Sequence, residues 1–171
     1  MSKSKPISPS KTIMTELVMP NDTNPLGNLM GGNLLRWMDI AASICAAKHC
    51  ESLVVTVSVD LVSFDQPILL GEVVTIKTTV TRAFNTSVEV NVQVYASNIK
   101  GNGTRKCNSA YFTFVALNED KTTKKVPKVQ PITDEEMRLY EGAIRRRQIR
   151  LIQAGKLEPK NAVEIREFIN R

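Results

Sequence analysis

The chain has 171 residues, an apolar fraction of 42% and a formal net charge of +6. Its length predicts one domain with an extension, large enough to bury an ordinary core, and an aromatic share of only 5% makes that core aliphatic. The positive charge suits an anionic partner without identifying one, and no apolar run is long enough to span a bilayer, which excludes a helical membrane protein.

The beginning of the chain is polar. Residues 1–11 are mostly Ser, Lys and Pro, which predicts a mobile N-terminal tail without the hydrophobic segment of a signal peptide. Residues 12–19 predict a strand that Pro20 ends, and residues 21–28 are dense in turn formers and predict a loop.

Residues 31–47 are apolar at nearly every position around a helix, which predicts a core helix ending near residues 48–50. Two glycines, Gly31 and Gly32, begin it, and one acid, Asp39, stands between apolar neighbours. A carboxylate on a buried helix is costly unless a partner satisfies it or a reaction uses it. Asp39 is therefore a candidate for chemistry, and the alternative is a structural acid bonded to Arg36, Lys48 or a backbone group.

The middle of the chain is predicted to form a β-sheet. Its β-branched runs predict four strands joined by short links, at residues 53–64, 72–82, 87–97 and 106–117. Short links imply antiparallel pairing, and a single apolar helix must then be wrapped by that sheet, which gives an α+β fold.

The end of the chain is predicted to form a linker and a helical extension outside the sheet domain. Residues 118–131 are polar and contain proline, and Thr133 with the acids after it predicts the start of a helix. Residues 159–171 add a short terminal helix. The predicted organisation is a tail at 1–11, a domain at 12–118, and a linker with a helical extension at 119–171.

Metal and triad chemistry is not expected. The cysteines Cys45, Cys50 and Cys107 have no metal-ligand spacing and predict reduced thiols in a cytoplasmic protein. The only histidine, His49, lies at the end of the core helix and is interpreted as structural. One histidine argues against both a Ser-His-Asp triad and a His-rich metal site.

Four stretches resemble the signatures of hotdog-fold acyl-CoA thioesterases, the group of YciA-like bacterial enzymes and brain acyl-CoA hydrolases. They are residues 24–39, residues 64–67 with Gly71 and Glu72, residues 85–87 followed by alternating valines, and residues 114–117. The resemblance covers about residues 12–131. It implies a hotdog fold and hydrolysis of acyl-CoA to free CoA and a carboxylic acid, with CoA present only as part of the substrate and no other cofactor.

The resemblance also assigns a working pair, Asp39 and Asn24, contributed by different protomers across a dimer, and it implies hexamers built as three dimers. Asp39 would act as a general base on water or as a nucleophile. Asn24 would orient water or the thioester carbonyl, and its alternative role is a turn residue before Pro25. Many relatives carry His or Phe where this chain has Met30, which bears on the shape of the pocket beside the thioester.

Backbone and surface groups complete the predicted site. A helix that begins with two glycines exposes N–H groups, so we expect Gly32 to polarise the thioester carbonyl and Gly31 to permit close approach; the alternative is a tight junction. Substrate contacts are expected from these residues and from a further set: Met30, Phe64, Arg82, Asn85, Thr86 and Ser87. The resemblance places the pantetheine arm at residues 85–87, for which plain turn chemistry is the alternative. Arg82 or the arginines at 145–147 could meet a CoA phosphate.

Three other functions fit the sequence less well. A hotdog hydratase or dehydratase would need a suitably placed histidine. A non-catalytic acyl-CoA-binding module would have no use for Asp39. Nucleic-acid binding rests only on the charge, since the strands show no aromatic platform with interleaved basic residues.

Overall fold

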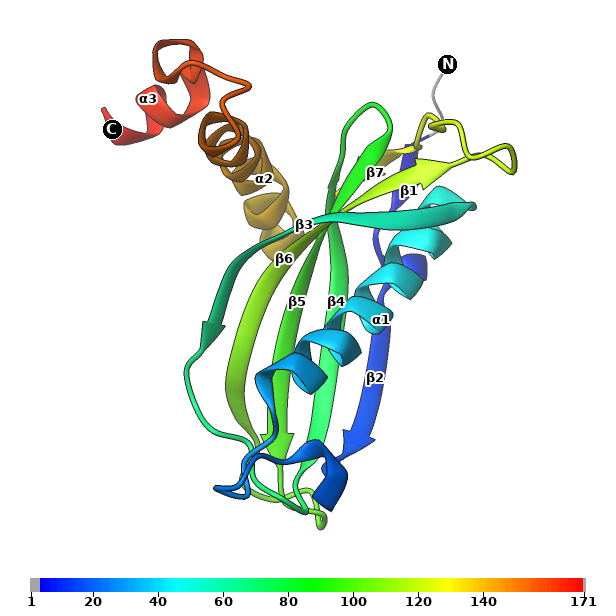
Figure 1. Cartoon of the computed structure of the whole chain (residues 1–171). Helices are drawn as coiled ribbons and strands as arrows, with labels where there is room; N and C mark the ends of the chain where they lie inside the picture. The colour runs from blue at the N-terminus through cyan, green and yellow to red at the C-terminus, as the bar shows by residue number, and fades with distance from the viewer. Residues whose placement is uncertain (1–3, 171) are drawn as a thin grey trace. The chain divides into compact units, whose positions relative to one another are not determined.

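The computed structural model describes residues 4–170 and divides into two compact units, Met1–Gln130 and Pro131–Arg171 (Figure 1). The first unit contains a five-stranded antiparallel sheet in the order β2-β4-β5-β6-β3. The strands are β2 (Thr12–Leu17), β3 (Leu53–Phe64), β4 (Val73–Ala83), β5 (Ser87–Ser97) and β6 (Arg105–Leu117). The four strands predicted after the helix are confirmed to within a residue at each end.

The helix α1 (Gly31–Cys50) packs across one face of this sheet (Figure 1). Met38, Ala41 and Cys45 on its inner side are fully buried, against a sheet face rich in buried valines. Its outer side is partly open in the single chain, since Ile40 and Ile44 are 37% and 41% exposed. The arrangement confirms the predicted α+β hotdog fold.

The structure differs from the mobile tail expected at residues 1–11. Residues 1–3 lie outside the described residues, but β1 (Ser4–Pro6) pairs in parallel with β7 (Lys128–Gln130). A 3-10 turn, η1 (Ser8–Ser10), follows. Ile7 is fully buried and anchors this segment, because one large apolar side chain removed from water stabilises it by about 2 kcal/mol.

The stretch expected as a plain linker also contains ordered structure. It carries β7, and Val126 and Val129 are buried. The border between the two units therefore falls after Gln130 rather than near residue 118. A second 3-10 turn, η2 (Pro20–Asp22), lies in the loop before α1.

The second unit is helical. It consists of α2 (Asp134–Gln153), η3 (Pro159–Asn161) and α3 (Val163–Ile169). Thr133 caps α2 as predicted: its hydroxyl accepts a hydrogen bond from the Glu136 N–H at 3.2 Å, and Glu136 reaches back to the Thr133 N–H. The Arg145 guanidinium lies 4.3 Å from the centre of the Phe168 ring, which joins α3 to α2. No helix among residues 4–170 is long and apolar enough to cross a membrane.

Candidate active site

Asp39 lies two turns into α1, at the start of its third turn, and is half-buried. The hydroxyl of Thr56 on β3 donates a hydrogen bond to its Oδ1 atom at 2.7 Å. Lys48, one partner considered from the sequence, bonds the Thr12 hydroxyl instead at 3.2 Å. The carboxylate is therefore held by one hydroxyl on an exposed strand. Sequence reasoning did not single out Thr56, because a threonine in a β-branched strand gives no separate signal.

The N-terminus of α1 presents backbone N–H donors that have no hydrogen-bond partner within residues 4–170. Its N-cap residue, Met30, makes no side-chain capping bond, and the first turn contains no acid. The N–H groups of the first turn therefore remain available to an incoming oxygen. A Cβ at Gly32 would meet nothing within 4 Å, so this glycine leaves open space. A Cβ at Gly31 would lie 3.2 Å from the Phe64 ring, so this glycine lets the ring pack closely.

Asn24 organises the loop before α1. Its Oδ1 atom accepts hydrogen bonds from the Leu26 and Asn28 N–H groups at 3.0 and 3.1 Å. This confirms a turn role, but the turn uses only the oxygen of the side chain. Because the oxygen is fixed by two donors, the orientation of the Nδ2 amide is fixed as well. The side chain thus presents a preorganised N–H donor.

Asn24 and Phe64 line the same cavity, of about 320 Å³. Its other walls include the apolar side chains of Leu34 and Ile68 and the polar side chains of Asn28 and Gln66, so it combines apolar and polar surface. Burial raises the pKa of the Cys107 thiol, which also lines the cavity and stays neutral. Met30 lies beside the cavity at the start of α1 and is 37% exposed. The structure brings Asn24, Gly31, Met30 and Phe64 together as a first group.

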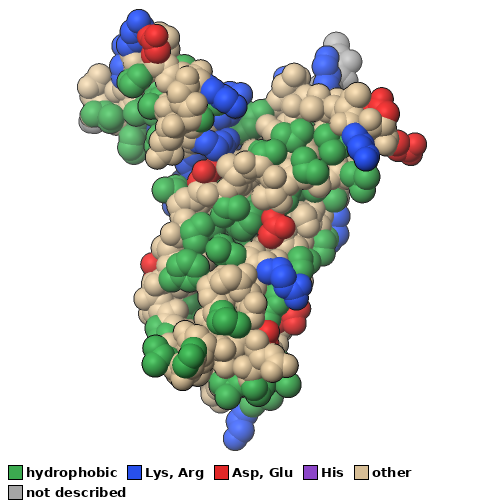
Figure 2. Space-filling view, in the orientation of Figure 1, with side chains coloured by type: hydrophobic (Ala, Val, Ile, Leu, Met, Phe, Trp, Pro, Cys, Tyr) green, Lys and Arg blue, Asp and Glu red, His purple; other side chains and the backbone are tan. Residues whose placement is uncertain are grey.

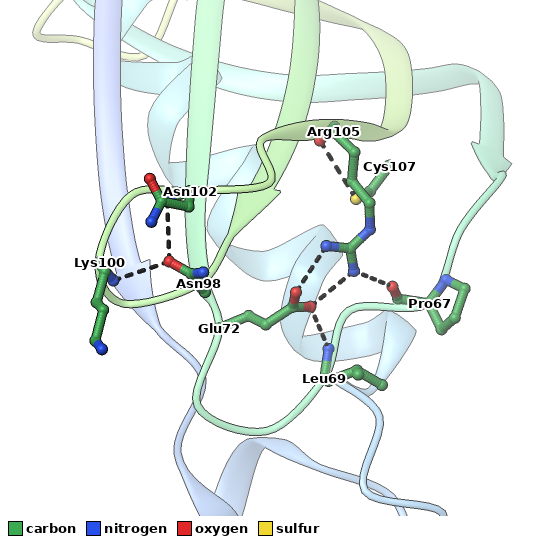
Figure 3. A network of polar contacts seen from close by, with 8 residues as sticks. All are labelled: Pro67, Leu69, Glu72, Asn98, Lys100, Asn102, Arg105 and Cys107. Carbon is green, nitrogen blue, oxygen red and sulfur yellow. Dashed lines mark hydrogen bonds and ion pairs between the residues drawn. The ribbon is translucent and has the colours of Figure 1, made fainter.

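An ion pair fixes the loop that forms one wall of this cavity (Figure 3). The Arg105 guanidinium donates to both carboxylate oxygens of Glu72, at 2.7 and 2.8 Å, and to the Pro67 carbonyl at 2.8 Å. Glu72 also accepts from the Leu69 N–H at 2.8 Å. The Arg105 hydrogen bonds are the main reason that the pKa of Glu72 is lowered. Sequence reasoning noted Glu72 but missed its partner, Arg105.

The same loop is tied to the Asn24 loop by backbone hydrogen bonds. The Leu29 N–H donates to the Ile68 carbonyl at 2.7 Å, and the Leu70 N–H donates to the Gly27 carbonyl at 3.0 Å. The ion pair therefore supports Asn24 through two connected loops.

Asn85, Thr86 and Ser87 form a tight connection between β4 and β5. The Phe84 N–H donates to the Ser87 carbonyl at 2.8 Å, which confirms the turn, and the Ala116 N–H donates to the Thr86 carbonyl at 2.9 Å. Ser87 pairs with Val115, and Val115 pairs with Val55, so the connection lies two strands away from Thr56, about 10 Å across the sheet. Arg82 lies on β4 beside a bulge, opposite Glu89.

The predicted residues thus divide into two groups in one chain. The first group lies at the start of α1 and consists of Asn24, Met30, Gly31, Gly32 and Phe64. The second group consists of Asp39, with Thr56 and the 85–87 connection. Along the helix, Gly31 and Asp39 are about 12 Å apart at ~1.5 Å per residue. The pair Asp39 and Asn24 is not in contact within the chain. Residues 4–170 contain no group of three or more His, Cys, Asp or Glu side chains placed to hold a metal.

Comparison with known proteins identifies the family of the chain. Residues 26–101 match the model of the thioesterase superfamily. The chain is 38% identical to the protein VdlD of Helicobacter pylori over 152 residues, 87% of each chain. It is 37% identical over 137 residues to an uncharacterised acyl-CoA thioester hydrolase, YkhA, of Bacillus subtilis, 80% of each chain. It is 36% identical to the cytosolic acyl coenzyme A thioester hydrolase of Mus musculus, covering 90% of this chain and 41% of that protein.

The solved structures that resemble this chain are also acyl-CoA thioesterases or hydrolases. An apo-hexameric acyl-CoA thioesterase superimposes with a TM-score of 0.86 and 39% identity, covering 89% of this chain and 97% of that one. An acyl-CoA hydrolase from Staphylococcus aureus, in complex with butyryl coenzyme A and coenzyme A, has a TM-score of 0.82 and 33% identity over 98% and 99% of the chains. Mutants of that hydrolase with an aspartate, a threonine or an asparagine changed to alanine are also among the similar structures. The chain belongs to the thioesterase superfamily, in its group of hotdog acyl-CoA thioester hydrolases.

Proposed function

We propose that this protein hydrolyses acyl-CoA thioesters at a site built from two copies of the chain. The observation that carries the proposal is the separation of Asp39 from Asn24 in one chain, combined with an exposed edge strand that would rejoin them. Each group alone is incomplete: one holds a carboxylate, and the other holds donors for a carbonyl oxygen beside a cavity.

The edge strand β3 supplies the route to a dimer. It ends the sheet, and no other strand among the described residues pairs with its outer edge. Apolar side chains along it are exposed, including Val57 at 54% and Leu61 at 66%. Hydrophobic side chains also spread over the face of the first unit that carries α1 and β3 (Figure 2). A long apolar edge is a template for pairing with another chain.

Two-fold symmetry decides how two such edges meet. In an isologous dimer the same strand of both copies pairs with itself, so the two β3 strands run antiparallel. The Phe64 end of one copy then lies beside the Thr56 end of the other. Asn24 and the start of α1 belong with Phe64, so this pairing carries them toward the second copy's Asp39. We infer the dimer as the minimal active unit and three such dimers as the assembly; the hexameric relative supports this size.

The chemistry follows from the two groups. The thioester carbonyl accepts hydrogen bonds from the Gly32 N–H and from the Asn24 Nδ2 amide, which stabilise the negative charge that develops on its oxygen. Asp39 of the other copy, oriented by Thr56, acts in one of two ways. As a general base it removes a proton from the water that attacks the carbonyl, and the thiolate of CoA leaves as the acid forms. As a nucleophile it attacks the carbonyl itself, the thiolate leaves, and water then hydrolyses the resulting mixed anhydride, which releases the acid and restores the carboxylate. No metal or redox cofactor takes part in these steps.

The mutants of the Staphylococcus aureus hydrolase support the assignment. They replace an aspartate, a threonine and an asparagine. In this chain Asp39, Thr56 and Asn24 have the same residue types and are separated along the chain by the same intervals. We assign Asn85, Thr86, Ser87 and Arg82 to the CoA part of the substrate. We assign the apolar part of the cavity near Phe64, formed with Leu34 and Ile68, to the acyl chain. We place the protein in the cytoplasm, which the cytosolic mouse relative supports.

Subunit complementation tests the proposal. Asp39→Asn and Asn24→Ala proteins should each release little thiol from butyryl-CoA. Mixed dimers contain one site in which both residues are intact, so co-expressed chains should regain about a quarter of the wild-type rate. If the mixture stays as inactive as its parents, the site is not shared between copies. If the wild-type protein releases no thiol from any acyl-CoA, the activity itself is refuted.

A further inference from the structure

The loop between β5 and β6 contains the only asparagine of the sequence that is followed by glycine, the pair Asn102 and Gly103. The loop is exposed and is organised by Asn98 (Figure 3). The Asn98 Oδ1 atom accepts hydrogen bonds from the Lys100 and Asn102 N–H groups at 3.0 and 2.9 Å, and the Asn98 N–H donates to the Asn102 carbonyl at 3.0 Å. The turn therefore uses the backbone of Asn102 and leaves its side chain in solvent.

Two groups in this pair can react with each other. The side-chain amide of Asn102 and the N–H of Gly103 make no hydrogen bond within residues 4–170. Gly103 has a φ of +68°, and a Cβ there would meet nothing within 4 Å, so the space beside this glycine is open. Attack of the Gly103 nitrogen on the amide carbon of Asn102 closes a five-membered ring without a side chain in the way.

Other asparagines lack this combination. Asn24 precedes Pro25, which has no N–H to react. Asn28 precedes Leu29, whose N–H is already held by a backbone carbonyl at 2.7 Å. Asn108 is fully buried, and its amide donates to a backbone carbonyl. The structure thus singles out one asparagine for this chemistry.

We propose that Asn102 is a site of spontaneous deamidation, with water as the only co-reactant. The Gly103 nitrogen loses its proton and bonds to Cγ of Asn102, the bond from Cγ to Nδ2 breaks, and ammonia leaves. Water then adds to either carbonyl of the resulting succinimide and breaks one ring C–N bond, which leaves aspartate or isoaspartate at position 102. The net change is an amide plus water giving a carboxylic acid plus ammonia.

The modified residue would lie close to the base of the loop. Ala96 pairs with Arg105 at that base, and Arg105 forms the ion pair with Glu72. In isoaspartate the chain runs through the side-chain carbons, so the carbonyl that accepts from the Asn98 N–H becomes part of a free carboxylate. The hairpin then loses a hydrogen bond and gains a negative charge three residues before Arg105.

Peptide mapping of the full chain tests the site. Trypsin cuts after Lys100 and Arg105, so residues 101–105 form a separate peptide. After incubation this peptide should show the mass gain of an amide-to-acid exchange, in two forms that separate by chromatography. Because the deprotonated fraction of a weak acid rises about tenfold per pH unit below its pKa, modification should be about tenfold faster at pH ~8.5 than at pH ~7.5.

Asn118 is the matched control within the same sample. It is also exposed, but its amide donates to the Thr122 hydroxyl at 3.0 Å and the next residue is Glu119. Its peptide should stay unmodified. An unmodified 101–105 peptide in the incubated protein would overturn the proposal, and so would equal modification at Asn118, because exposure alone would then decide the reaction.

The variant Asn102→Gln tests the consequence. It keeps an amide in the turn, but its reaction needs a six-membered ring, which closes far more slowly. Incubated wild-type protein should lose about 2–4 °C in melting temperature, the shift expected for one lost hydrogen bond in a chain of this size, whereas the incubated variant should not. An equal loss in the variant would overturn the effect on the hairpin. None of these measurements needs turnover, so they stand apart from the test of hydrolase activity.

Discussion

The Thr56 hydroxyl donates to the Asp39 carboxylate at 2.7 Å and thereby links the edge strand β3 to the central helix. The two residues lie 17 positions apart in the chain. Since β3 is one of the two edge strands of the sheet, the bond places the only acid of α1 beside the surface that a second copy would cover in the proposed dimer. Pairing of the two β3 strands in the proposed dimer is therefore coupled to the orientation of the Asp39 carboxylate.

Replacing Thr56 separates the two roles of this bond. Thr56→Val keeps the branched shape of the side chain in β3 but removes the donor, so we expect kcat to fall by about tenfold, the value of one hydrogen bond to a charged group. Thr56→Ser keeps the hydroxyl and should retain most of the activity. Both variants should elute as the wild-type oligomer in size-exclusion chromatography. Equal rates for the two variants would remove Thr56 from the site.

Asp39→Asn removes the charge but keeps an oxygen that Thr56 can reach. We expect a folded oligomer whose thiol-release rate falls by ~10²-fold or more, the scale of a lost general base. The rate is measured with a panel of acyl-CoA substrates, and circular dichroism checks the fold. A variant with near-full turnover would show that this acid has only a structural role.

Asn24 can be tested with a nearly isosteric pair. Asn24→Asp keeps the oxygen that accepts from the Leu26 and Asn28 N–H groups but lacks the amide donor. We expect kcat to fall by about 10²-fold, as for loss of one oxyanion donor, with the melting temperature nearly unchanged. Asn24→Ala should lose activity and some stability, because the turn loses its acceptor. A purely thermal defect in both variants would contradict the catalytic role.

The fold could be predicted from particular stretches of the sequence. Alternating valines at residues 88–94 predicted a strand, and the apolar run at 31–47 predicted the helix that the sheet must cover. The parallel pairing of β1 with β7 could not be predicted, because two three-residue segments more than a hundred positions apart carry no local pattern. Ile7 looked like a lone apolar residue in a polar tail.

A site residue could be predicted from the sequence where its type was unusual for the element that contains it. Asp39 stood out as an acid in an apolar helix, and Gly31 with Gly32 stood out at its start. Thr56 and Arg105 sit in strands where their residue types are ordinary, and each acts on a partner far along the chain. Only the three-dimensional structure reveals such pairs.

His49 should make stability depend on pH. Its ring is buried, its Nε2 atom lies 3.0 Å from the Pro127 carbonyl oxygen, and its Nδ1 atom has no partner among the described residues. Burial lowers the pKa of this histidine below its ordinary value of 6.5; Lys5 lowers it further, while Pro127 and Glu51 act in the opposite direction. Because the unfolded chain takes up the proton more readily, stability is greatest above about pH 6.5 and falls as the pH drops below that value.

Thermal unfolding from about pH 7.5 to pH 5 measures this effect. His49→Gln has an amide that can still donate to Pro127 but does not titrate in this range, so its melting temperature should vary less with pH. If wild type and variant lose stability in parallel, the histidine does not control the acid response.

The Arg105–Glu72 ion pair should govern substrate binding through the loops that it supports. Arg105→Lys keeps the charge but cannot donate to both Glu72 oxygens and the Pro67 carbonyl at once. The wall formed by Ile68 would then loosen, and with it the Asn24 loop. We expect KM to rise and kcat to fall, together about tenfold in kcat/KM. Lys106→Ala, at an exposed neighbouring position, is the control. If Arg105→Lys changes the melting temperature but leaves both kinetic constants intact, the pair serves stability alone.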